Sequence, residues 1–217
     1  MILSALKRLP FVRNYTSSQW SKWWAKRPID WGKEYFTPDH LHRNIIVAIL
    51  KSIPWFSLFE VGCGAGANLA KIIHHIPGKQ LGGVDINPEA IKVASEKMTG
   101  GHFKVGNMDD ILMSDNSVDV VLTDMSLIYA GKIDKVLGEI KRIARNYIVL
   151  CELSSSKWYE RWWIFLTSGL HMYNYPKLLQ KYGFYNIIAY KIPKEAWSSD
   201  KQIRYGYVLL AKVPRRK

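Results

Sequence analysis

The run Glu-Val-Gly-Cys-Gly-Ala-Gly carries the clearest chemical signal of the chain. Gly62, Gly64 and Gly66 allow a tight turn and let a ligand come close to bare backbone amides. The loop follows an expected strand and opens an expected helix, whose N-terminus favours a negative group. Its spacing fits the dinucleotide pattern G-x-G-x-x-G/A, with Ala67 last, and also G-x-G-x-G preceded by an acid, Glu60. The loop alone therefore leaves the kind of ligand open.

Further polar residues follow the next expected strands. Asp85 closes the second strand, where a carboxylate can accept hydrogen bonds from both hydroxyls of a ribose. After the third strand, Asp109 could accept from an exocyclic amine, and Met108 could pack on a flat ring. Ligands of open parallel sheets bind beyond the carboxyl ends of the strands, so we expect these side chains near the loop. The alternative for Asp109 is a cap on a helix before Ile111.

Candidates for proton transfer lie where a second ligand should bind. Glu152 ends the fifth expected strand and should point toward the ligand edge. His171 lies in an aromatic segment after that strand, and His40 and His42 precede the first strand. Histidine suits proton transfer near neutral pH. Each of these residues also has an ordinary structural interpretation, so Glu152 and His171 are the catalytic candidates by position alone.

The elements that must position these residues alternate along the chain. Strands are expected at 57–62, 80–86, 102–106, 117–125 and 146–153, and helices at 65–76, from Asn87 to about Gly100, and at 133–144. A helix beginning at Thr37-Pro38-Asp39 precedes them; a helix at 175–182 and strands at 184–192 and 203–213 follow. This alternation indicates βαβ units and a parallel sheet. The last two strands have no helix between them and are most easily antiparallel.

Five motifs in this order resemble the class I S-adenosylmethionine-dependent methyltransferases. The likeness is greatest to the small-molecule (methyltransferase type 11) enzymes related to ubiquinone and menaquinone biosynthesis. The motifs are Glu60 to Gly66, Gly83-Val-Asp-Ile86, Gly106-Asn-Met-Asp109, Asp119 to Asp124 and Leu137 to Arg142. The resemblance covers roughly residues 40–152. It implies an α/β, Rossmann-like, seven-stranded, mostly parallel sheet with an antiparallel C-terminal edge pair and helices on both faces.

The resemblance also implies S-adenosylmethionine as cofactor and a set of residues that bind it. By that likeness, Glu60 and the loop glycines hold the methionine part, Asp85 holds the ribose, and Met108 and Asp109 complete the adenine site. Asp124 would lie near the amino-acid end; its alternative is a solvated loop acid. The full set is Glu60, Gly62, Gly64, Gly66, Asp85, Ile86, Asn107, Met108, Asp109 and Asp124.

The methyl acceptor is constrained mainly by missing motifs. Such a cofactor brings its own leaving group, so the protein mainly aligns the reactants and needs a base only for a protonated nucleophile. The Asn/Asp-Pro-Pro-Tyr/Phe tetrapeptide, typical in this superfamily of enzymes that methylate amino groups of bases or glutamine, does not follow the fourth strand. Cys63 and Cys151 do not form a nucleophile pair, and no metal-ligand cluster is apparent. We therefore expect a small aromatic or apolar acceptor, methylated at O, N or C.

Charge leaves a second function open. The formal net charge is +13, and lysine and arginine outnumber acids seven to one in residues 1–33 and ten to two in residues 177–217. Such basic ends could attract nucleic acid or an anionic surface. The alternative is therefore a methyltransferase or binding protein directed at RNA or another nucleic acid. An NAD-dependent oxidoreductase is disfavoured because no hydride-transfer constellation is visible.

Tryptophan is concentrated near residues 20–31 and 158–163, among basic residues. Aromatic and basic side chains together can stack bases, sit at a membrane interface, or cover a pocket. We expect residues 1–36 to form a basic, Trp-rich extension that could act as a lid, and residues 37–217 to form the methyltransferase domain. The insertion 154–176 is the candidate substrate roof. Two cysteines and the lack of a signal-peptide core or a transmembrane stretch predict a cytoplasmic protein.

Overall fold

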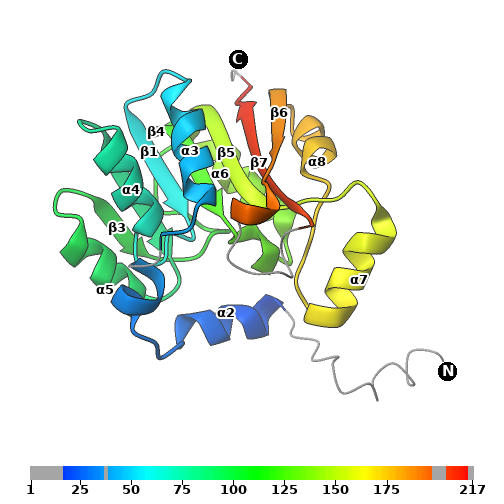
Figure 1. Cartoon of the computed structure of the whole chain (residues 1–217), viewed down its shortest axis with the longest axis horizontal. Helices are drawn as coiled ribbons and strands as arrows, with labels where there is room; N and C mark the ends of the chain where they lie inside the picture. The colour runs from blue at the N-terminus through cyan, green and yellow to red at the C-terminus, as the bar shows by residue number, and fades with distance from the viewer. Residues whose placement is uncertain (1–16, 37–38, 197–203, 215–217) are drawn as a thin grey trace.

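The computed structural model describes residues 17–36, 39–196 and 204–214. One seven-stranded sheet forms its centre, in the order β3-β2-β1-β4-β5-β7-β6 (Figure 1). The strands are β1 (Ser57–Val61), β2 (Gln80–Asp85), β3 (His102–Val105), β4 (Val118–Asp124), β5 (Ala144–Leu153), β6 (Tyr185–Lys191) and β7 (Gly206–Lys212). β3, β2, β1, β4 and β5 pair in parallel, whereas β7 is antiparallel to β5 and β6. The predicted fold class and its antiparallel edge pair are thus confirmed.

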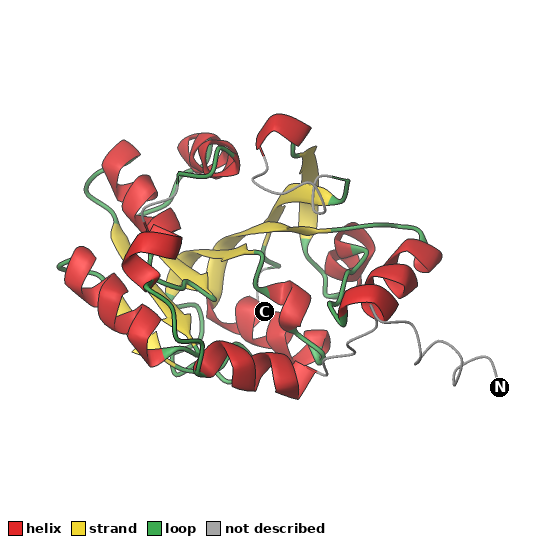
Figure 2. Cartoon of the chain, turned by 60° about the horizontal axis from the view of Figure 1, so that its bottom comes forward, coloured by secondary structure: helices red, strands yellow, loops and turns green. Residues whose placement is uncertain are grey.

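Helices cover both faces of this sheet (Figure 2). The helices are α2 (Ser17–Ala25), α3 (His42–Lys51), α4 (Ala67–His75), α5 (Pro88–Lys97), α6 (Ile133–Ile143), α7 (Trp158–Ser168) and α8 (Tyr175–Lys181). One buried cluster joins α6 and α8 to the sheet, and the other joins α3, α4 and α5 to the opposite face. Strands covered on both sides must be apolar throughout, which explains the continuous burial of β4 from Val118 to Thr123.

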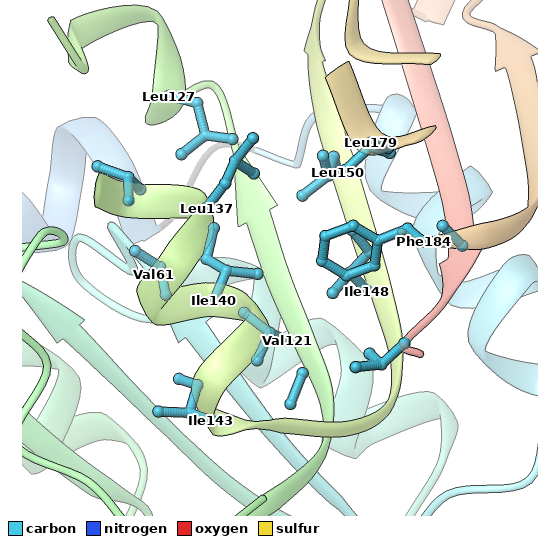
Figure 3. Packing of buried hydrophobic residues seen from close by; sticks show 14 of the residues in the cluster. Val61, Val121, Leu127, Leu137, Ile140, Ile143, Ile148, Leu150, Leu179 and Phe184 are labelled. Atoms are coloured by element: carbon cyan, nitrogen blue, oxygen red, sulfur yellow. The ribbon is translucent and has the colours of Figure 1, made fainter. Parts of the chain in front are cut away.

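α6 shows how periodicity builds this core. Its apolar residues recur at helical spacing, so that Leu137, Ile140 and Ile143 lie on one side and are fully buried. Figure 3 shows these side chains in one buried cluster with Val121 of β4 and Ile148 of β5. Burying five such side chains on one helix fixes α6 against the sheet. The carboxyl end of β4 is thereby held beside that of β1.

Some boundaries differ from those expected. The helix before β1 begins at His42 rather than at Thr37-Pro38-Asp39, and residues 37–38 lie outside the described chain. No helix joins β3 to β4, so Asp109 caps none; a turn closed by an Asn107–Asp110 bridge stands there instead. The insertion 154–176 contains α7, which the sequence did not predict because it carries aromatic residues on most turns.

Within the described ranges, we find no helix with both the length and the apolar character needed to cross a bilayer.

Candidate functional site

The glycine-rich loop makes a sharp turn between β1 and α4. Gly62, Gly64 and Gly66 have φ values of +79°, +52° and +82°, a region that favours glycine. A Cβ on Gly62 would lie 2.4 Å from the Cβ of Ser126, so the loop packs against the end of β4 without room for a side chain. The amides of Gly62 and Cys63 both donate to the carbonyl of Val84. The turn is therefore held between β2 and β4, with the N-terminus of α4 behind it.

Asp85 joins this loop to the next βα connection. Its Oδ2 accepts from the amide of Gly64 at 2.9 Å, and its Oδ1 accepts from the amide of Asn87 at 2.9 Å. Burial raises the pKa of Asp85 above its usual value, although these amides oppose that rise. Asn87 caps α5 through Ala90 and donates from Nδ2 to the carbonyl of Trp24 at 2.7 Å. A single connection thus orients the loop, α5 and the N-terminal segment.

A buried polar cluster lies beneath the loop. Asn68 of α4 donates from Nδ2 to Oε1 of Glu60 at 2.6 Å and to Oδ2 of Asp124 at 3.0 Å. His42 Nε2 lies 2.9 Å from the same Oδ2 of Asp124. Burial drives the pKa of Glu60 well above its usual value. Burial would also raise the pKa of Asp124, but the charge of His42 and its hydrogen bond to Asp124 have the larger effect. The pKa of Asp124 is therefore lowered. His42 thus keeps one buried carboxylate ionised.

The same cluster contains a group of metal-ligand type that the sequence did not indicate. His42, Asp124 and Cys151 each place one ligand atom within 4.8 Å of the others. His42 and Asp124 use those atoms for each other, and burial raises the pKa of the Cys151 thiol well above its usual value. Because Asp124 Oδ2 already accepts from Asn68 and pairs with His42, the group forms an internal hydrogen-bonded cluster.

A cavity of about 790 Å³ opens over the loop and the ends of β1, β2 and β4. Most of the predicted site residues line it: Gly62, Gly64, Asp85, Ile86, Asn107, Met108, Asp109, Asp124 and His171. The structure thus brings together residues spread over more than a hundred positions. Glu60, Gly66 and Glu152 lie behind this wall.

Glu152 is fully buried at the end of β5. Its Oε1 accepts from the amides of Ser126 and Leu127 at 3.1 and 3.0 Å. Burial raises its pKa to about 8, against the opposing effect of these amides. The carboxyl group therefore anchors the turn after β4, which carries cavity residues. Its geometry favours a positioning role, and its catalytic role stays a prediction.

His171 is the part of the insertion that reaches the cavity among the described residues. Its ring is stacked on Tyr173 and lies near Phe165, and its backbone amide donates to Ile128. Burial lowers its pKa, so the imidazole is mostly neutral at pH 7. A neutral imidazole on a cavity wall can accept a proton. The exposed aromatic residues of α7 are not part of that wall.

The N-terminal segment supplies cavity residues that the site prediction missed. Trp24, Trp31 and Tyr35 line the cavity, and Tyr129, after β4, packs on Trp24 with ring centroids 5.4 Å apart. Arg27 holds this group by donating to the Tyr35 hydroxyl at 2.8 Å. The clustered tryptophans were the signal that could have located them. Figure 1 shows α2 passing below the ends of the parallel strands.

Comparisons with known proteins agree with this geometry. A family model described as a methyltransferase domain matches residues 57–204. Squalene methyltransferase 2 of Botryococcus braunii is 26% identical over 173 residues, covering 76% of this chain and 44% of that protein. Botryococcene C-methyltransferase of the same organism is 28% identical over 137 residues, covering 59% of this chain and 36% of that protein. The chain thus spans less than half the length of these two relatives.

Solved structures share the fold. A geranyl diphosphate methyltransferase in complex with GPP and sinefungin superposes with a TM-score of 0.62 at 15% identity, covering 80% of this chain and 77% of that one. The family match includes the glycine loop, Asp85 and the strands whose ends carry the cavity. This chain belongs to the class I S-adenosylmethionine-dependent methyltransferases.

Proposed function

We propose that this protein transfers a methyl group from S-adenosylmethionine to a small, largely apolar acceptor. One observation carries the proposal: a single cavity joins the glycine loop and Asp85 to an aromatic end formed by Trp24, Tyr129 and His171. Its volume of about 790 Å³ is at the upper part of the range of small-molecule sites, which suits two ligands.

The residues at the loop end fit the cofactor. Asp85 lines the cavity, and its two oxygens, which each accept from a backbone amide, keep acceptor capacity for ribose hydroxyls. Met108 and Asp109 border the cavity beside it and would contact the adenine. Glu60 Oε2 and Asn68 Oδ1 are buried acceptors with no hydrogen-bond partner among the described residues. Asn68 and Asp124, which line the cavity, would suit the ammonium group of the methionine part, and Glu60 would hold Asn68 in place.

The acceptor end is lined by aromatic and aliphatic side chains, including Trp24, Ile128 and Tyr129. Such a wall favours a flat or apolar molecule over a polyanion. Three relatives support this choice, since they are named for squalene, botryococcene and phthiotriol dimycocerosates, whereas two others are named for malonyl-[acyl-carrier protein]. These names do not favour the nucleic-acid alternative.

The cofactor, when bound, supplies an activated methyl group and its own leaving group. The chain would align the acceptor through its aromatic wall and exclude water, which is catalysis by proximity. His171 would accept the proton that the acceptor loses, whereas Glu152 would position the turn after β4. Residues 17–36 would act as a lid, because Trp24 and Trp31 lie over the cavity and the Asn87–Trp24 hydrogen bond ties them to the cofactor loop.

The test is methyl transfer from isotopically labelled cofactor to a panel of acceptors, followed by mass spectrometry. The panel contains linear isoprenoid alkenes, long-chain phenols and an RNA oligonucleotide. We expect turnover with an apolar compound. His171→Gln should lower kcat and leave the affinity for S-adenosylhomocysteine unchanged. Turnover with the RNA and with no apolar compound would overturn the proposal. In that case, binding of the RNA should weaken steeply between about 50 and 200 mM salt.

A further inference from the structure

α7 turns its apolar side away from the protein. Successive helical residues are about 100° apart, so six of its seven large apolar residues fall within one arc about 160° wide, and Ile164 lies on the opposite side. The residues of the arc are Trp158, Tyr159, Trp162, Trp163, Phe165 and Leu166. A helix packed on a globular core normally directs such an arc inward. Here it faces outward, which is the reverse of ordinary amphipathic packing.

The polar side of α7 is hydrogen-bonded to the segment just before the helix, and Glu160 also pairs with Arg204. Glu160 Oε2 accepts from the Ser155 hydroxyl, and Arg161 Nη1 donates to the carbonyls of Ser155 and Ser156. Ile164 packs against the small buried cluster that contains Ile128. These contacts fix the rotation of α7 about its own axis. Ile164 and the Glu160–Arg204 ion pair tie the opposite side of α7 to distant parts of the chain, so the aromatic arc faces outward.

The arc is widely exposed. Trp158, Trp163 and Trp162 are 69%, 60% and 52% exposed, and Tyr159 and Phe165 are 50% and 40% exposed. None of the eleven residues of α7 is buried. Contiguous exposed apolar patches of this kind mark sites of interaction with proteins or membranes.

Basic side chains border the arc. Lys157 and Arg204 both lie 3.7 Å from Glu160, with their side chains 54% and 74% exposed. Arg161 adds a third cation on the helix itself, so cations outnumber the acid in this group. Tryptophan, tyrosine and basic residues together form the composition that binds the interface of anionic bilayers. A second copy of this chain fits less well, because its net charge is also +13.

The position of α7 suits such a surface. Eleven residues give a helix about 16 Å long, which can lie in an interface but cannot cross it. Figure 1 shows α7 at the edge of the molecule, on the side where α2 runs below the parallel strands. The chain then continues to His171 on the cavity wall. A surface bound by α7 therefore lies near the cavity.

We propose that α7 is an interfacial anchor that binds the surface of an anionic lipid bilayer through its outward aromatic arc and its basic border. An apolar acceptor dissolved in the bilayer would then be close to the cavity. The anchor itself depends only on α7, so it can be tested without any acceptor and independently of the proposed function.

The test measures co-sedimentation of the full chain with vesicles of phosphatidylcholine alone and with phosphatidylglycerol added. We expect binding to the anionic vesicles, reduced by raising salt from about 0.1 to 0.5 M. The variant Trp158→Ser/Trp162→Ser/Trp163→Ser should partition at least about tenfold more weakly. The matched control is Phe56→Ser/Tyr185→Ser/Tyr190→Ser, which changes three exposed aromatic residues outside α7 and should bind like the wild type.

Circular dichroism, thermal unfolding and light scattering of each variant separate binding from folding and assembly. The proposal is overturned if the folded wild type does not bind anionic vesicles, or if the two triple variants bind equally. It is also overturned if the tryptophans of α7 are needed only for self-association or only for RNA binding. Retained affinity for S-adenosylhomocysteine in the α7 variant would show that the cofactor site is intact, whatever the outcome with vesicles.

Discussion

Asp85 offers the sharpest test of how the cofactor is held. Its carboxylate accepts from the amides of Gly64 and Asn87 and lines the cavity. Asp85→Ala removes an ionised acceptor of both ribose hydroxyls and also releases the glycine loop. Hydrogen bonds to a charged group contribute about 1.5–3 kcal/mol. The dissociation constant of the cofactor should therefore rise by about 10- to 150-fold.

Isothermal titration calorimetry with S-adenosylhomocysteine measures this change directly. Asp85→Asn retains one oxygen acceptor without the charge, so we expect a smaller loss of affinity. Asp134→Ala is the control, because the Asp134 carboxylate is exposed and does not line the cavity. It accepts a hydrogen bond from the hydroxyl of Tyr182. An affinity of folded Asp85→Ala within about twofold of the wild type would refute the ribose assignment. An equal loss in Asp134→Ala would show that the effect is not specific to the site.

Three further predictions concern the framework of the site. Gly62 and Gly78 both have positive φ, but only the former would place a Cβ against a neighbour, at 2.4 Å. Gly62→Ala should therefore lower the free energy of unfolding, measured with urea, by about 1–3 kcal/mol more than Gly78→Ala; equal losses would contradict the clash. The folded-state pKa of Glu152, about 8, lies above its usual value of 4.5. As pH rises, Glu152 therefore loses its proton in the unfolded protein before it does so in the folded protein. The free energy of unfolding of the wild type should thus fall as pH rises from 4.5 to 8. Glu152→Gln should flatten that decline in urea titrations across this range, and an unchanged slope would count against the assignment. His42→Ala and Asp124→Asn should show a coupling free energy of about 1 kcal/mol or more in a double-mutant cycle, whereas additive losses would mean that their hydrogen bond contributes little.

Local spacing was enough to predict the cofactor loop. Gly62, Gly64 and Asp85 lie at the ends of consecutive strands, and a βαβ unit has one usual handedness. Parallel pairing then brings the ends of the strands to the same edge of the sheet. The residues that the sequence assigned to the cofactor, apart from Glu60 and Gly66, line the cavity for this reason.

Contacts between distant segments could not be predicted in the same way. His42 meets Asp124 across 82 positions, and Asn87 meets the carbonyl of Trp24 across 63. Neither pair has a signature in sequence spacing, because each depends on how a helix outside the βαβ series packs over the sheet. The sequence likewise placed Glu152 at the ligand edge, but only its neighbours show that its side chain turns inward.

The sequence by itself determined the order of the strands and of the helices between the parallel ones, the glycine turn and the acid that closes β2, since these depend on interactions along short stretches of chain. Only the tertiary structure decided that Trp24 and Trp31 line the cavity and that the apolar arc of α7 faces outward. Periodicity shows that a helix has an apolar side. Which way that side faces depends on contacts such as the packing of Ile164 in the cluster of Ile128 and the ion pair of Glu160 with Arg204, which form only when distant parts of the chain pack together.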